Sequence, residues 1–433
     1  MITVNEIYDE LEAFEGEARA LHHENYLLYR DFYRGGELPL NYIRRNPRES
    51  RKHWANRCAR LVAVNYCAPI VDKTVRAEYS RRVARNVEST EAQDLLRRVA
   101  GKNALHTFQL RTARQRAIDG TCIVQLYWDD RAGTVRLRHV LPEHCYPVCV
   151  SDHERIDAVI IDRGGVGRNS YGADLPARRV EIYTPNEVGV FDGGRRLNEP
   201  ADGGPEVREA NYGMLPFVVF NGQRLVGDVF GTSLLRGIAE LNHAINQGLN
   251  DVLEILHFQA FSLLVIQGAL DSLPVDEDGR PRLSISESGF LNIDENGRVY
   301  FVDPNPKISE ILEVLEALIR MMFETGSVPV AAARPQQSHA ESAASRQVQF
   351  MPLIDLVMEL QTFDRESEEE MIEKIMRIHS VHTGAEVKPG KIDVRFPRSF
   401  LPADEEVRQR MNIEAMNAGL KTKEEILKDS SEL

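Results

Sequence analysis

The sequence has few cysteines and no long apolar run. Of its 433 residues, 5 are cysteine, an odd number. A disulfide framework is therefore not expected, and a reducing compartment such as the cytosol suits the chain. Because no stretch of about 18 apolar residues is present, no membrane-spanning helix is predicted. The acidic N-terminus lacks the apolar segment of a signal peptide.

The motifs of common enzyme classes are also missing. The pattern G-x-x-x-x-G-K-[ST] does not occur, which excludes a P-loop, and neither does the nucleophile motif G-x-S-x-G. The glycine-rich residues 164–167 lie between predicted strands and are interpreted as a turn. We therefore expect no catalytic residue and no cofactor. A process that needs energy from ATP would depend on a partner protein.

Two groups of residues resemble metal ligands but lack the right spacing. Asp276, Asp278 and Gly279 are interpreted as a hairpin turn, because the later positions of a calcium loop are not matched. Five histidines and cysteines lie within 15 residues, without the C-x-x-C or H-x-x-x-H spacing of zinc sites, so no metal site is expected. These five are His139, His144, Cys145, Cys149 and His153.

Charge is distributed unevenly along the chain. The net charge of −13 argues against a protein that coats DNA by neutralising its phosphates. Residues 41–140 nevertheless hold 21 Lys and Arg against 9 Asp and Glu, a net charge of +12, whereas residues 307–433 have a net charge of −7. The basic block is either a nucleic-acid patch or a set of ion pairs between neighbouring subunits, and both interpretations stay open.

The first half of the chain has the pattern of an α+β domain, and roughly two to three domains are expected over the whole length. The spacing of apolar residues predicts helices over residues 3–34, 54–76 and 91–118. Alternating runs on either side of residues 129–133 predict a β-hairpin. Further strand-like runs then follow, so residues 35–230 are expected to pass from helices to a mostly antiparallel sheet.

Two long amphipathic helices bracket a small β-rich insert in the second half. A helix is predicted over residues 233–260, capped by Thr232 or Ser233, and another over 308–325, with the insert at 262–306 between them. One face of the first helix is apolar, and the other is expected to line water or contact neighbouring subunits. That polar face comprises Glu240, Asn242, Asn246, Gln247, Asn250, Asp251 and Glu254.

The remainder of the chain begins with a polar loop. Residues 328–350 are rich in Ala, Ser, Gln and Pro, which predicts a mobile loop between helices. A long helix is expected over residues 342–383, with an acidic patch at Glu366, Glu368, Glu369 and Glu370. A strand at 391–396 and a helix at 404–419 close the chain.

Short groups of residues follow one another in a characteristic order over some 400 residues. They are Tyr26, Tyr29, Phe32, Tyr33 and Gly35; Asn65, Ile70, Val71 and Asp72; Ala117, Asp119 and Gly120; Pro142 and Pro147; Pro216, Phe220, Asn221, Gly231, Ser233, Leu241 and Asn246; Ile319, Val328 and Pro329; Glu341, Ser342, Ala343 and Ala344; and Phe396, Leu401, Pro402, Asp404, Gly419 and Leu420. In this order they resemble the portal proteins of tailed double-stranded DNA phages, of the long-tailed siphophage type. Ala343 departs from the family's usual glycine.

The resemblance implies a portal fold with an α/β wing, a two-helix stem, a small β-rich clip and C-terminal helices. Many relatives continue into a helical crown, which is expected to be small or absent here. The implied boundaries are 1–230 for the N-terminal part of the wing, 231–261 for the first stem helix, 262–306 for the clip, 307–326 for the second stem helix, 327–345 for a tunnel loop, 346–400 for the C-terminal part of the wing and 401–433 for a helical segment or short crown.

The function implied by the resemblance is that of a ring, dodecameric in the virion, that forms a channel for double-stranded DNA. DNA enters the capsid through it during packaging and leaves through it during ejection. The implied partners are the large terminase, the major capsid and scaffold proteins and a head-completion adaptor, with no membrane involved. The ring is expected at the capsid vertex of the virion, after assembly in the host cytoplasm.

A channel for DNA should let the polymer slide, because tight phosphate contacts add a steep, salt-dependent affinity. Short or neutral polar groups suit such a lining, and Arg334 and Arg346 are the permanent cations expected nearest the DNA. The alternatives are an ordinary surface loop and an ordinary amphipathic helix. The candidate channel residues are Arg334, Gln336, Gln337, His339 and Arg346 in the loop and Asn242, Asn246, Asn250 and Glu254 in the stem.

Two other functions remain open at this point. One is a different ring protein of the virion, such as a neck adaptor. The other is a hydrolase whose dispersed active site leaves no motif. A strict monomer would argue against any ring, and a small ring without an axial hole would favour the adaptor.

Overall fold

The chain folds into two compact units in a computed structural model. The larger unit comprises residues 1–35, 65–240 and 321–433, and the smaller unit comprises residues 36–64 and 241–320. The structure describes residues 2–22, 24–47, 49–150, 155–163, 178–193, 205–259, 263–267, 298–302, 308–329, 343–397 and Met416. Among these residues, no helix combines the length and apolar character needed to cross a membrane.

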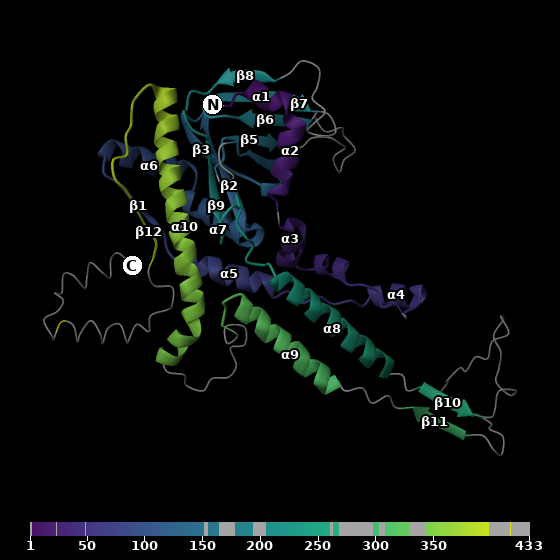
Figure 1. The fold of residues 1–433 in the computed structure, drawn as a ribbon. Coiled ribbons are helices and arrows are strands. Elements are labelled where there is room, and N and C mark those ends of the chain that lie inside the picture. The colour runs from purple at the N-terminus through teal and green to yellow at the C-terminus, as the bar shows by residue number, and fades with distance from the viewer. Residues whose placement is uncertain are drawn as a thin grey trace. The chain divides into compact units, whose positions relative to one another are not determined.

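Two antiparallel sheets form the centre of the larger unit (Figure 1). The first has the strand order β3-β2-β9 and the second the order β4-β5-β6-β7-β8, and strands β1 and β12 form a separate pair. The strands are β1 Ala84–Val87, β2 Thr121–Asp129, β3 Thr134–Val140, β4 Cys145–Val148, β5 Ala158–Asp162, β6 Arg178–Tyr183, β7 Glu187–Gly193, β8 Glu206–Glu209, β9 Phe217–Asn221 and β12 Ile392–Arg395.

Helices pack on the two sheets and on one another. They are α1 Val4–Asp9, α2 Leu11–Ala20, α3 Tyr26–Arg34, α5 Cys67–Glu78, α6 Thr90–Lys102, α7 Leu105–Asp119 and α10 Ala343–Thr383. Helices α1 and α2 pack on the five-stranded sheet, whereas α6, α7 and α10 pack on the three-stranded sheet. The larger unit is therefore layered as helix, sheet, sheet and helix.

Alternation along the strands explains this layering. In β5, Ile160 faces the cluster that contains Val4 and Ile7 of α1, whereas its neighbour Ile161 faces the cluster shared with the three-stranded sheet. Successive side chains of a strand point to opposite faces, so a continuous apolar strand is buried on both sides. The run AVIID of β5, all five residues of which are buried, meets that condition.

The outer edge of β9 is covered by side chains of α10. Lys374 Nζ donates to the carbonyl of Phe217 at 2.5 Å, and Ser367 Oγ donates to the carbonyl of Val219 at 3.1 Å. Strand β9 is the end strand of its sheet, and these two carbonyls accept from α10 on the side away from β2. Polar side chains of the long helix thus take the place of a further strand.

The smaller unit contains η1 Leu38–Tyr42, α4 Arg51–Cys58, most of α8 Ile238–Gln259, most of α9 Ile308–Thr325 and the strand pair β10 Leu263–Gln267 and β11 Arg298–Val302. The prediction of α9 is confirmed at both ends, and that of α10 to within one residue. The rest of the 262–306 insert and the helix expected at 404–419, apart from Met416, lie outside the described residues.

Four of the predicted helices are wrong in extent. Residues 3–34 form three helices instead of one, and residues 91–118 are interrupted at Ala104, which has a left-handed φ of 49°. The helix expected over 54–76 is broken by the non-helical residues 61–66. Helix α8 begins at Ile238 rather than near Ser233, because Gly237 has a φ of 77°, outside the helical region.

Candidate functional site

A ladder of three asparagines on α8 binds the backbone of the non-helical residues 61–66. Asn242, Asn246 and Asn250 are spaced four residues apart, so they lie on one face of the helix. All three are buried. Their amides bond to a single short stretch of chain, and we call them the asparagine ladder.

The ladder imitates the edge of a β-strand. The side chain of Asn250 accepts from the N–H of Val62 at 2.9 Å and donates to its carbonyl at 2.7 Å. One turn earlier, Asn246 accepts from the N–H of Val64 at 2.8 Å, and Asn242 donates to the carbonyl of Val64 at 2.9 Å. Buried backbone groups need such partners, so the ladder satisfies a segment that has no sheet to join.

Ion pairs extend this contact toward α4. Arg60 bonds Glu254 at 3.1 Å, and His53 lies 2.8 Å from the same carboxylate. The buried Arg57 pairs with Asp251. The acidic residues of α8 therefore neutralise basic residues of α4 within the smaller unit.

The polar face of α8 was expected to line water or to contact neighbouring subunits, and the structure differs from this expectation. Asn242, Asn246 and Asn250 do not line water, because they are buried against residues of the same chain, and Glu254 is occupied by α4. The exposed surface of these helices carries apolar side chains among charged ones such as Glu313 and Glu316. It includes Leu253 and Leu256 on α8 and Leu312 and Val314 on α9, of which Val314 is 59% exposed.

Helices α8 and α9 approach closely at a glycine. A Cβ atom added to Gly248 would lie 2.8 Å from Cδ2 of Leu315, which is buried. Leu315 thus occupies the space that a larger residue of α8 would fill. The residue types at this crossing set the separation of the two helices.

The candidate loop residues lie outside what can be described. Arg334, Gln336, Gln337 and His339 fall within 330–342, between the described residues that end at 329 and the start of α10. Arg346 belongs to α10, but its side chain is not among those described. The assignment of these residues to a channel stays a prediction.

A buried ionic cluster ties α10 to the rest of the larger unit. Arg116 of α7 bonds both carboxylate oxygens of Glu78 on α5, at 2.6 and 2.7 Å, and also bonds Asp364 of α10. The hydroxyl of Tyr79 donates to the other oxygen of Asp364 at 2.6 Å. Arg116, Glu78 and Asp364 are each 1% exposed or less, so a guanidinium and two carboxylates are held away from water.

A second ion pair lies beside the first. Arg85 of β1 bonds both oxygens of Glu368 at 2.8 Å, and Glu368 is fully buried. The acidic patch expected at residues 366–370 is therefore wrong for Glu368. Burial raises the pKa of Glu368, against the opposing effect of Arg85. Burial likewise raises the pKa of Glu78 to about 8, with Arg116 opposing the rise and Asp364 adding to it.

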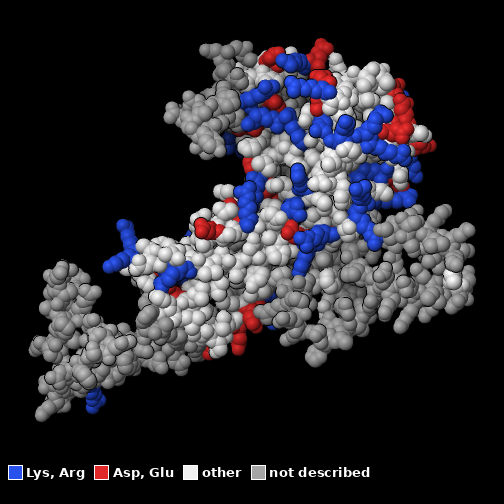
Figure 2. Space-filling model, turned by 180° about the vertical axis from the view of Figure 1, so that it is seen from behind, with Lys and Arg blue, Asp and Glu red and all other residues white. Residues whose placement is uncertain are grey.

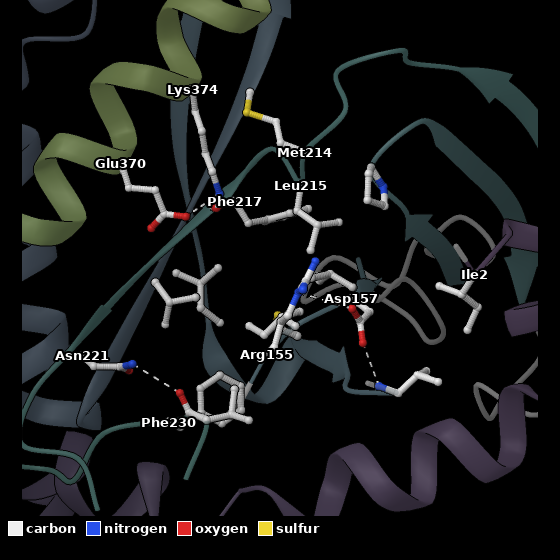
Figure 3. A pocket seen from close by; sticks show the side chains of 18 of the residues that line it. Ile2, Arg155, Asp157, Met214, Leu215, Phe217, Asn221, Phe230, Glu370 and Lys374 are labelled. Carbon is white, nitrogen blue, oxygen red and sulfur yellow. Dashed lines mark hydrogen bonds and ion pairs between the residues drawn. The ribbon is translucent and has the colours of Figure 1, made fainter. Parts of the chain in front are cut away.

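A cavity of about 930 Å³ opens where the two sheets face each other (Figure 3). Ile123, Phe217 and Phe230 form part of its apolar wall. Several of its charged groups are already engaged, since Glu370 lies 2.7 Å from Lys374 and Asp157 accepts from the N–H of Val150 at 2.9 Å. Among the described residues, the lining contains no histidine.

The histidines and cysteines noted in the sequence also have structural surroundings. His139 stacks on Phe108 with ring centroids 4.0 Å apart and lies 2.9 Å from the hydroxyl of Thr112. Cys145 is buried in β4. Within the described part of the chain, no group of three or more His, Cys, Asp and Glu side chains is placed to hold a metal ion.

Comparison with known proteins gives one family. The family model described as "Phage portal protein, SPP1 Gp6-like" matches residues 18–432. Among proteins with curated functions, none matches the sequence.

Solved structures with a similar course of the chain come from gene transfer agent (GTA) particles. The virion of the native particle contains a chain 14% identical, with a TM-score of 0.43 over 82% of this chain and 88% of that one. The neck of the native particle, computed with C12 symmetry, gives 13% identity and a TM-score of 0.45 over 83% and 88%. The neck of the empty particle, computed with C6 symmetry, gives 13% and 0.46 over the same shares.

Proposed function

Because the chain belongs to the SPP1 Gp6-like family of phage portal proteins, we propose that it forms a ring whose axial channel carries double-stranded DNA into the capsid and out again. The ring connects head and tail at one capsid vertex of the virion. We propose twelve subunits for the ring in the virion. Its proposed partners are the large terminase, the major capsid and scaffold proteins and a head-completion adaptor.

The observation that supports a ring is the apolar surface of α9. Of the apolar side chains on this helix, only Leu315, Met322 and Phe323 are buried, whereas Leu312 and Val314 are exposed. Exposed apolar side chains that gather on one helix commonly mark a surface that a partner covers. In a ring the partner is the next copy of the chain, which contacts it through a different surface, and rotation closes the circle.

We propose that α8 and α9 are the stem, residues 262–306 the clip and residues 327–345 the tunnel loop. The asparagine ladder changes the role assigned to α8. Its amides hold residues 62–64, so the stem contribution of Asn242, Asn246, Asn250 and Glu254 is to fix the helix rather than to touch DNA. Contact with DNA in the channel is then left to the loop, where Arg334 and Arg346 supply the cations.

Electron microscopy of the purified chain, together with its mass by light scattering, tests the ring. A ring with an axial hole wide enough for a duplex is expected. A monomer of 49.1 kDa at high concentration would contradict the proposal. A small ring without an axial hole would favour a neck adaptor instead.

Deleting residues 332–341 tests the role of the loop. Rings should still assemble, because the deletion spares α9 and α10, but particles should package or retain less DNA. The measurement is the DNA content of particles assembled with the shortened chain. Loss of folding on deletion would show that the segment belongs to the core.

A further inference from the structure

Several exposed cations of the larger unit have no ion pair among the described residues, and four of these lie on α6, on α7 and just before β1. They are Arg82, which precedes β1, Arg98 and Lys102 on α6, and Arg111 on α7. In contrast, the exposed Arg97 on the same helix is 3.0 Å from Asp94. We call these four residues the basic face. Lys and Arg side chains gather over one side of the larger unit, whereas Asp and Glu lie mainly at its margins (Figure 2).

Several contacts place the basic face on one group of packed elements. Helix α6 packs on α7, on β1 and on β3. The side chain of Arg136 on β3 donates to the carbonyl of Lys102, which brings a further guanidinium to the end of α6. The four cations thus belong to elements that adjoin one another.

The pKa values of three histidines in this region are lowered in part by nearby arginines. Burial, and then the nearby Arg111, lowers the pKa of His139 to about 4. Burial followed by Arg82 and Arg85 lowers the pKa of His106, and burial followed by Arg98 lowers that of His379, with a small opposing effect of Glu91. In each case the charge of a nearby arginine contributes to the lowering of the histidine pKa.

We propose that the basic face binds the phosphate backbone of double-stranded DNA outside the channel. This rests on the proposed function, because a portal ring is in contact with packaged DNA. Lys and Arg make most phosphate contacts, and such contacts carry no sequence preference. The net charge of −13 does not oppose this, because the excess carboxylates lie elsewhere in the chain.

The surroundings of the cations favour DNA over a second copy of the chain. Interfaces between proteins have an apolar centre. None of the large exposed apolar residues belongs to α6 or α7 among the described residues, whereas α8 and α9 expose several. A charged surface without an apolar centre is the type that meets a polyanion.

Covalently closed circular DNA is the probe that isolates this surface, because a closed circle cannot thread the axial hole. Binding to the purified ring is measured as a function of salt. The variant Arg82→Gln/Arg98→Gln/Lys102→Gln/Arg111→Gln is compared with Arg155→Gln/Arg179→Gln/Arg208→Gln/Arg224→Gln. The control removes the same charge from exposed positions on other elements.

Removal of the basic face should weaken binding and reduce the slope of log affinity against log salt by about 3 to 4, at about 0.9 per phosphate contact. The control should bind as the parent does. Unchanged binding by the first variant, or equal weakening in both, overturns the inference. The inference is also overturned if the variant without the basic face fails to form rings while the control forms them. The basic face would then be an interface between copies. A parent chain that forms no ring contradicts the proposed function itself.

Discussion

The asparagines of α8 show how a polar side chain can serve the fold instead of the surface. Asn250 makes two bonds to Val62 and donates to the carbonyl of Asn246 at 2.7 Å. A polar residue on an amphipathic helix is ordinarily interpreted as solvent-facing. The spacing of four does not distinguish the two cases, because it puts the asparagines on one face without showing what covers that face.

Replacing Asn250 with leucine should therefore destabilise the smaller unit. The substitution keeps the branched shape of the side chain but removes both hydrogen bonds to the backbone of Val62, at a cost of about 0.5–1.5 kcal/mol for each bond. The expected result is a lower urea midpoint and faster proteolysis within residues 59–66. Gln247→Leu, one turn away at a partly exposed position, is the control and should change the midpoint little. Equal effects would show that any polar residue of α8 matters alike.

The buried ionic cluster predicts a pH dependence of stability. Because burial raises the pKa of Glu78 to about 8, the folded chain binds a proton there more tightly than the unfolded chain does. The stabilising contribution is complete below the unfolded value of 4.5 and is lost as the pH rises through about 8.

The variant Glu78→Gln should therefore lose less stability than the parent between pH 5 and pH 8. The measurement is the urea midpoint of both proteins across that range. Glu206→Gln, which alters an exposed carboxylate on β8, should follow the parent curve. Parallel curves for Glu78→Gln and the parent would show that Glu78 is charged throughout, held so by Arg116.

At the scale of elements, periodicity predicts what is regular and misses what is interrupted. The bounds of α9 follow from its apolar spacing, because no residue inside it opposes a helix. The break at Ala104 could not be predicted, since alanine has the highest helix propensity and its left-handed φ is imposed by the packing of α6 on α7.

The non-helical residues 61–66 were missed for a related reason. Their apolar pattern continues that of the flanking helices, while their actual partners lie some 180 residues away on α8. A tertiary contact of that range leaves no local signal. The same holds for the buried ionic cluster, where Arg116 and Asp364 are separated by 248 positions.

Two helical glycines should respond in opposite directions to the same substitution. Gly248→Ala places a Cβ atom 2.8 Å from Leu315, and overpacking of this kind costs about 1–3 kcal/mol before the gain in helix propensity. Gly101→Ala meets nothing within 4 Å and should stabilise α6 by about 0.5–1 kcal/mol. Thermal unfolding of both variants checks the signs. If Gly248→Ala raised the midpoint as Gly101→Ala does, α9 would not be held against α8.

At the scale of the whole molecule, the order of elements carried more information than any motif. The family was inferred from the order of short residue groups over some 400 residues, supported by two amphipathic helices that bracket an insert and precede a polar loop. The candidate site could be inferred only in part. Its stem positions belong to an intrachain contact, and its loop positions lie outside the described residues.

The exposed apolar residues of α9 predict where the ring can be broken. Leu312→Glu/Val314→Glu puts two charges on a surface that the next copy should cover, so rings should give way to smaller species without loss of helicity. Light scattering measures the size of the assembly, and circular dichroism measures the helicity. Val207→Glu, on the exposed strand β8, is the control and should leave rings intact. Rings that persist in the double variant would place the subunit contact elsewhere.

The side chains that cover β9 have a consequence for assembly. Many identical copies must meet before a ring closes, and each carries a sheet with an end strand. An open end strand is a template for pairing with another chain, which leads to fibres instead of closed rings. Lys374 and Ser367 occupy the carbonyls of that strand before any copy arrives. By covering this edge, the long helix disfavours strand pairing between copies. Copies can then associate through the surfaces that form a closed ring.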